Sequence, residues 1–126
     1  RENALMYNDG QGYIRYQKGS LVFYALSDYI GEENLNGALK KYVEKVQFQE
    51  SPYTTSIEMV DYINKVTPDS LKYVIKDMFE TITLYRNRIV DVKSTVLENG
   101  KYKVDIEFNV SKYRNDNKGK RFYYFL

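Results

Sequence analysis

Residues 102 to 110, Tyr-Lys-Val-Asp-Ile-Glu-Phe-Asn-Val, alternate apolar and polar side chains without a break. Successive side chains of a strand point to opposite faces, so this stretch predicts a strand with one apolar face. Before the pair Asn99-Gly100, the residues Val90, Val92 and Val96 repeat the same alternation. The two stretches together predict an antiparallel hairpin.

The length of the loop decides which residues of this hairpin face each other. A two-residue turn would pair Lys93 with Ile106 and set a charge opposite the apolar face. A three-residue loop over residues 98–100, with Gly100 in a left-handed conformation, instead pairs Val92 with Ile106 and Val96 with Tyr102. We therefore expect the three-residue loop.

The last residues extend the β part of the chain. A third strand is expected near residues 121–125, so that the hairpin is the opening of a larger, incomplete sandwich. Phe122–Leu126 is an uncharged aromatic run, which at an exposed sheet edge would favour self-association. The alternative interpretation of this run is a core strand that has been cut short.

Upstream of about residue 81 the apolar residues recur with helical rather than alternating spacing. The spacing predicts about four amphipathic helices that bury one another's apolar stripes. The predicted stripes are Ile14, Leu21, Val22, Ala25, Leu26 and Tyr29; Leu35, Leu39, Tyr42, Val43 and Val46; Ile57, Val60, Ile63 and Val66; and Leu71, Val74, Ile75, Met78 and Phe79.

Local signals place the ends of these helices. Gly31 is expected to stop the first helix, and Glu32 and Glu33 suit the positive end of the second helix dipole. Thr55 and Glu58 have the spacing of a capping box for the third helix. Thr67-Pro68 predicts a cap and a first-turn proline for the fourth.

The change of period predicts an α+β chain with two parts. Residues 1–86 form a mainly helical bundle segment, and residues 87–126 form a short antiparallel β element. The first part has the amphipathic pattern of a packed core, whereas the second is expected to be the start of a sandwich.

The amino-acid composition limits the reactions and binding partners that are compatible with this chain. The chain has 126 residues, 19 basic and 17 acidic, a net charge of +2, and neither histidine nor cysteine. The usual ligands of zinc, the thiol nucleophile and the usual general base are therefore missing, so transition-metal chemistry must use residues outside this chain. The small net charge and interspersed acids argue against a nucleic-acid partner, and no apolar run is long enough to span a membrane. The start, Arg1-Glu2-Asn3, lacks an initiator Met and a signal pattern, so we expect an excised fragment.

The run from Tyr13 to Ser20, Tyr-Ile-Arg-Tyr-Gln-Lys-Gly-Ser, is difficult to explain by packing alone. On a regular helix Tyr16 projects opposite the apolar stripe, on the face of Ser20 and Phe23, where it is either a surface tyrosine or borders a cleft. Lys18 would point into the stripe, so either regular helix begins after it or its ammonium is paired. The preceding residues 9–12 lack the ending of a phosphate loop and predict a turn.

The sequence Tyr16-Gln17-Lys18-Gly19 and the pattern that follows resemble a known family. Further residues that carry the resemblance are Val22, Leu26, Ile30-Gly31-Glu32-Glu33, Leu35, Tyr42 and Thr54-Thr55. Over residues 10–65 they are similar in order and spacing to the region after the zinc site of the aminopeptidase N and leukotriene-hydrolase family of metallopeptidases. The whole chain is most similar to bacterial members attached to transporter-permease-like membrane segments.

The resemblance implies a zinc-dependent aminopeptidase whose zinc motif and amino-terminus-binding motif lie upstream of Arg1. It assigns one catalytic residue to this chain, Tyr16, as the phenol that donates to the oxyanion during peptide hydrolysis. Tyr13 takes its place only if the register of the match is wrong. No cofactor is expected within the chain. Its expected partners are the upstream zinc-binding part of the same polypeptide and a peptide substrate. The chain alone is expected to be inactive. The rival hypothesis is a helical interaction module that keeps the peptidase shape without the chemistry.

Overall fold

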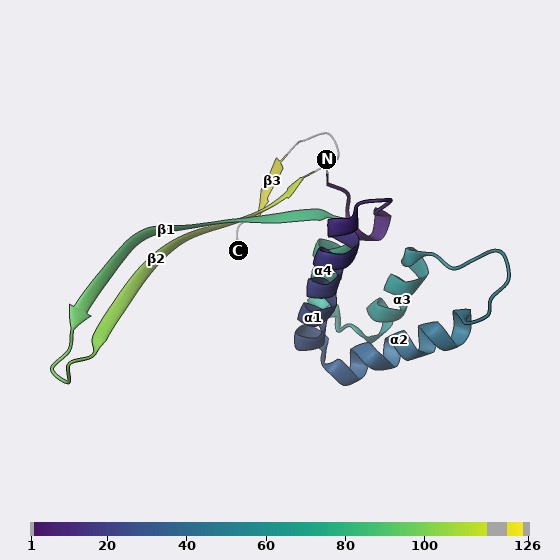
Figure 1. Cartoon of the computed structure of the whole chain (residues 1–126), viewed down its shortest axis with the longest axis horizontal. Coiled ribbons are helices and arrows are strands. Elements are labelled where there is room, and N and C mark those ends of the chain that lie inside the picture. Colours follow the sequence, from purple (N-terminus) through teal and green to yellow (C-terminus); the bar gives the residue numbers. More distant parts are fainter. Residues whose placement is uncertain (1, 116–120, 125–126) are drawn as a thin grey trace. The chain divides into compact units, whose positions relative to one another are not determined.

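The computed structural model describes residues 2–115 and 121–124, and the chain has an α+β fold (Figure 1). It divides into two compact units, Arg1–Ile82 and Thr83–Leu126. The helical unit contains η1 (Leu5–Tyr7), η2 (Tyr13–Lys18), α1 (Gly19–Ile30), α2 (Glu32–Val46), α3 (Ser56–Val66), η3 (Asp69–Leu71), α4 (Lys72–Ile75) and η4 (Lys76–Glu80). The β unit is built from β1 (Ile82–Val96), β2 (Tyr102–Asn115) and β3 (Arg121–Tyr124).

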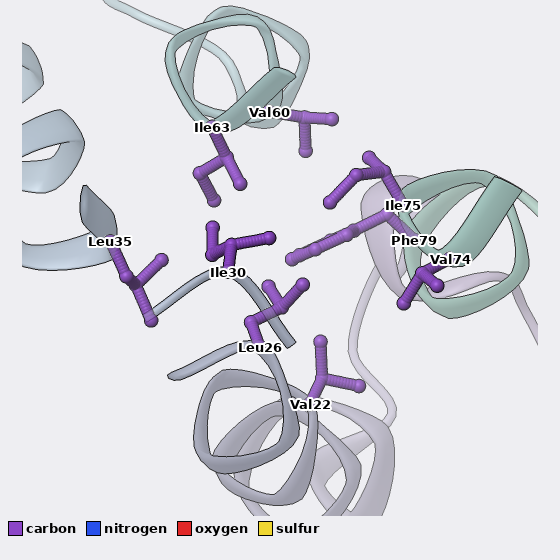
Figure 2. Packing of buried hydrophobic residues seen from close by; sticks show 9 residues of the cluster. All are labelled: Val22, Leu26, Ile30, Leu35, Val60, Ile63, Val74, Ile75 and Phe79. Carbon is purple, nitrogen blue, oxygen red and sulfur yellow. The ribbon is translucent and has the colours of Figure 1, made fainter. Parts of the chain in front are cut away.

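The core of the helical unit is a cluster of aliphatic side chains around Phe79 (Figure 2). Phe79 is 1% exposed and makes an edge-on contact with Phe23, with ring centroids 5.9 Å apart. Figure 2 shows its ring reaching from η4 toward Leu26 and Ile30 of α1. The cluster consists of Val22, Leu26, Ile30, Leu35, Val60, Ile63, Val74, Ile75 and Phe79.

The stripe predicted for the first helix is partly wrong. Val22 and Leu26 are buried as expected, but Leu21 is 69% exposed and Tyr29 48% exposed. For Leu21 the reason is the π-helical turn η2, whose wider spiral shifts the phase of α1 relative to Ile14, so that Val22 and not Leu21 lies in line with Ile14. Val43 of α2 and Ile57 of α3, both predicted to be apolar contacts, are likewise about half exposed.

Gly31 stops the first helix as predicted. It adopts φ 86°, a conformation that side chains with a Cβ rarely take, and α2 begins at the next residue. The Asn34 side-chain amide donates to the Ile30 carbonyl at 2.8 Å and so satisfies one of the carbonyls at the end of α1. Glu32 and Glu33 occupy the first turn of α2, where the sequence placed them.

The capping box predicted for the third helix is absent. Thr55 is the N-cap of α3 as expected, but its side chain makes no capping hydrogen bond. Glu58 is instead bound by the Lys45 ammonium from α2 and by the Thr54 hydroxyl, at 2.8 Å from its Oε2. The Thr54 hydroxyl also contacts the Tyr42 hydroxyl at 3.1 Å, so Glu58 ties α2, the loop and α3 together.

The fourth helix is interrupted rather than continuous. It consists of the 3-10 turn η3, the single α-helical turn α4 and the π-helical turn η4. Thr67 does not cap it, because its hydroxyl donates back to the Ile63 carbonyl at 2.8 Å at the end of α3. The predicted core residues Val74, Ile75 and Phe79 are nevertheless buried.

The β unit is a three-stranded sheet in the order β1-β2-β3 (Figure 1). The three-residue loop predicted between β1 and β2 is confirmed: the Leu97 amide donates to the Lys101 carbonyl at 2.8 Å, and Gly100 has φ 75°. Because Leu97 faces Lys101, the next residues outward on the two strands, Val96 and Tyr102, face each other. This is the register that the hydrophobic pattern required. β1 begins at Ile82, several residues before the alternation becomes regular.

The third strand is also found where the sequence placed it. β3 pairs with β2 antiparallel, with Tyr113 opposite Tyr123. The predicted self-association edge, Phe122–Leu126, reaches beyond the residues whose side chains are described, and Phe125 and Leu126 lie outside the described residues altogether.

The Lys45–Glu58 pair makes the stability of the helical unit depend on pH. The hydrogen bond from Lys45, followed by that from Thr54, lowers the pKa of Glu58 below its ordinary 4.5, and the hydrogen bond from Glu58 raises the pKa of Lys45 above 10.5. A lowered acid pKa stabilises the fold above the unfolded value and loses that contribution as pH falls through the folded value. The Lys45 contribution is present below 10.5 and is lost as pH rises through its raised value.

We therefore expect Glu58→Gln to lower the urea midpoint at pH 7 and to have a smaller effect at pH 3, which lies below the ordinary value of 4.5 at which Glu58 takes up a proton in the unfolded chain. Circular dichroism at the two pH values measures this, with Glu44→Gln as the control for loss of an exposed carboxylate on α2. An equal loss at both pH values would contradict the role of the charged pair.

Candidate functional site

Tyr16, the predicted catalytic residue, lies in the π-helical turn η2 that precedes α1. Its side chain is 71% exposed, so the phenol is open to solvent. π-Helical turns are uncommon and are frequent at functional sites. The turn leads directly into Gly19, whose amide donates to the carbonyls of Ile14 and Tyr16.

Gln11 anchors the start of this turn. Its carbonyl accepts the amides of Ile14 and Arg15, each at 3.1 Å, and the Asn8 side-chain amide at 3.2 Å. Its side-chain oxygen accepts the Asn3 amide at 2.9 Å, and its own amide donates to the Asn8 side chain at 3.3 Å. The predicted turn over residues 9–12 is present, with Gly10 at φ 77°. Gln11 thus holds the backbone at the start of η2, just before Tyr16, by several hydrogen bonds.

Lys18 is paired, as its position on the helix predicted. Regular α-helix begins at Gly19, and the Lys18 ammonium lies 3.0 Å from Oε1 of Glu2. The two side chains are 24% and 28% exposed. Both accounts offered for Lys18 therefore hold, and the residue has a structural role in tying the N-terminal segment to η2.

A groove of ≈ 480 Å³ opens beside η2. Its lining is largely apolar, with the Lys18–Glu2 pair among its polar members. The lining residues are Glu2, Tyr13, Ile14, Gln17, Lys18, Leu21, Val22, Ala25 and Met78. Tyr13 lines this groove but Tyr16 does not.

A second, smaller groove of ≈ 160 Å³ lies on the η1 side of the helical unit, and Tyr16 does not line it either. The face predicted to accompany Tyr16 is also only partly open. Phe23 is half-buried against Phe79, and the hydroxyl of Ser20 donates to the Gln17 carbonyl at 3.0 Å. The described residues therefore leave the Tyr16 phenol open to solvent, and neither groove encloses it.

Among residues 2–115 no group of three or more acidic side chains is arranged to hold an ion, and histidine and cysteine do not occur in the sequence. The zinc that the resemblance implies therefore does not fit this chain's own residues.

In the part of the chain that the structure describes, no helix is both long and apolar enough to cross a membrane.

Sequence reasoning predicted the pairing of Lys18 but missed Glu2, Gln11 and the groove, and the catalytic role of Tyr16 stays a prediction. Glu2 is 16 residues from Lys18 along the chain, and no local pattern connects the two. Gln11 acts mainly through its backbone carbonyl, which every residue possesses. The groove depends on Met78 and Leu21 coming together, which is a property of the packed unit.

Comparison of the chain with protein-family models, with curated proteins and with solved structures finds no match.

Proposed function

We propose that this chain is part of a zinc-dependent aminopeptidase and supplies the oxyanion-stabilising tyrosine, Tyr16, and one wall of the substrate cleft. The observation that carries the proposal is an exposed phenol on a turn anchored by Gln11, within the Tyr-x-Lys-Gly sequence that resembles the family. A phenol O–H can donate to the oxyanion that forms when water adds to the scissile carbonyl. Zinc, bound by another part of the protein, would supply the Lewis acid.

Further parts of the proposal rest on the resemblance alone. The zinc ligands and the group that holds the substrate's amino terminus belong to the upstream part of the same polypeptide. The β unit is the opening of the sandwich that follows the catalytic region. The parent is a bacterial protein attached to permease-like membrane segments.

A second candidate function is a helical interaction module that has kept the peptidase shape and lost the chemistry. The groove beside η2 favours it, because an apolar lining with few polar groups suits docking of another chain better than proton transfer. The two candidates differ in the upstream sequence: an intact His-Glu-x-x-His motif with a distal Glu supports the enzyme, and degraded motifs support the module.

The test uses the full-length protein that contains this chain. We expect the purified protein to hold about one zinc ion per chain by mass spectrometry and to hydrolyse aminoacyl amides, with activity lost on chelation and restored by zinc. The 126-residue chain alone serves as the zinc-free, inactive control. A full-length protein that holds no zinc and cleaves nothing would overturn the enzyme and leave the interaction module.

A further inference from the structure

The loop that joins α2 to α3, residues 47–55, is held to these helices at one position, and we call it the strap. All of its residues are described by the structure, and among them only Thr54 is partly buried while the others are exposed. The Thr54 hydroxyl donates to Oε2 of Glu58 on α3 at 2.8 Å and lies 3.1 Å from the hydroxyl of Tyr42 on α2. The Gln49 side chain, in contrast, donates to a carbonyl within the strap.

The groups around Thr54 form a chain of hydrogen bonds with a defined direction. A hydroxyl has one proton to donate, and that of Thr54 goes to Glu58, so Tyr42 donates to Thr54. Glu58 also accepts from the Lys45 ammonium. A hydrogen bond to an ionised acceptor is roughly twice as strong as a neutral one. Removal of the Thr54 hydroxyl would therefore break the links of the strap to α2 and to α3 together.

The helices α2 and α3 have contacts of their own that do not involve the strap. The rings of Tyr42 and Tyr62 meet edge-on, with centroids 5.9 Å apart. Leu35 of α2 and Val60 of α3 are both buried in the cluster around Phe79, and no residue of the strap belongs to that cluster. The two helices can therefore stay packed when the strap is released, which is the condition for a local opening.

Phe48, near the start of the strap, has a backbone conformation that must be held in place. Its φ is 60°, in the left-handed region that a bulky side chain rarely adopts. The side chain is 98% exposed, so no packing of its own offsets this strain. The strap thus combines backbone strain near one end with a single side-chain anchor near the other.

We infer that the Thr54 hydroxyl is a clasp that closes the strap, and that without it the strap opens while the core of the helical unit stays folded. The strap is then the first part of the helical unit that becomes accessible to a protease. This conformational device is independent of the proposed peptidase function. The contacts that carry it all lie between Tyr42 and Tyr62, within one compact unit.

The first test uses two substitutions of Thr54 that differ in one group. Thr54→Val removes the hydroxyl and keeps the branched shape, whereas Thr54→Ser keeps the hydroxyl. In NMR relaxation of the 126-residue chain we expect backbone order parameters near 0.85 at positions 53 and 54 in the wild type and Thr54→Ser, and a fall toward about 0.6 in Thr54→Val. The amide of Phe79 should keep its value in all three proteins. Equal order parameters in the two variants, or an equal fall at Phe79, would overturn the inference.

The second test measures opening by limited proteolysis of the same chain. Phe48 and Tyr53 give chymotrypsin two cleavage sites in the strap. Within the helical unit we expect the first cut in the strap, made roughly fivefold faster in Thr54→Val than in Thr54→Ser, the change in open population that loss of one typical hydrogen bond produces. A first cut elsewhere in the helical unit of the wild type, or equal rates for the two variants, would contradict the clasp.

A pair of carboxylate substitutions tests the acceptor of the clasp in the same assay. Glu58→Ala removes the group to which the Thr54 hydroxyl donates and should also speed cleavage in the strap. Glu44→Ala removes a carboxylate that lies 3.8 Å from Lys40 on the exposed side of α2, and it should cleave at the wild-type rate. Equal rates for these two variants would show that Glu58 does not hold the clasp closed.

Discussion

Replacing Phe79 with alanine is expected to lower the free energy of unfolding of the helical unit by about 3–5 kcal/mol. Phe79 is 1% exposed and belongs to the cluster that joins α1, α2, α3 and α4. Truncation removes the buried ring, leaves a cavity between helices that cannot fully collapse, and deletes the edge-on contact with Phe23. Urea denaturation followed by circular dichroism measures the loss.

Phe48→Ala provides the matched control, because Phe48 is 98% exposed and its removal leaves no cavity. Its effect should stay within about 0.5 kcal/mol. If Phe79→Ala leaves too little folded protein to measure, Phe79→Leu fills more of the space and should show a smaller loss of the same sign. Equal stabilities of the Phe79 and Phe48 variants would contradict the position of Phe79 at the centre of the core.

The features that the sequence predicted correctly are those fixed by a few neighbouring residues. Gly31 and Gly100 both have positive φ, because the turn at each position demands a conformation that other residues resist. The hairpin register follows from a pattern with a period of two, in which a slip of one residue would turn every apolar side chain to the wrong face. The α+β class itself follows from the change between helical and alternating spacing.

The features that the sequence did not predict depend on distant partners or on irregular backbone. A regular helical wheel places Leu21 in the core, whereas the π-helical turn before α1 moves it to the surface. Glu58 has the spacing of a cap, but Lys45 lies 13 residues away in sequence and close by in space, and it takes the carboxylate instead. Competition between a local and a tertiary partner for one side chain cannot be judged from spacing alone.

The candidate site also contains one feature that was identified from the sequence and one that was not. Tyr16 was identified from the resemblance, and its exposure follows from lying away from the buried residues Ile14 and Val22. The groove beside η2, in contrast, is lined by residues from the N-terminal segment, η2, α1 and η4, which only the folded unit brings together. Tyr13 lines that groove and Tyr16 does not, so the two tyrosines of one turn lie in different surroundings.

Replacing Tyr16 with phenylalanine in the full-length protein is therefore the sharpest test of the catalytic role. Loss of one oxyanion donor typically costs a factor of 10²–10³ in kcat, or about 2.7–4 kcal/mol of transition-state stabilisation. Because the oxyanion exists only after water has added, we expect kcat and kcat/KM to fall together by about 100-fold while KM stays unchanged. Steady-state kinetics on an aminoacyl amide, with zinc content and circular dichroism measured on the same sample, separates this effect from loss of metal or fold.

Tyr13→Phe is the matched control, since it removes the same hydroxyl three residues earlier in the same turn, from a side chain that is 51% exposed. If Tyr16 is the donor, Tyr13→Phe should leave kcat close to that of the wild type. A large fall for Tyr13→Phe and none for Tyr16→Phe would shift the catalytic role to the groove beside η2. A fall in neither would remove the tyrosine from the mechanism, and the exposed phenol of Tyr16 would then favour the interaction module, because an exposed tyrosine can serve as a contact residue without any catalytic role.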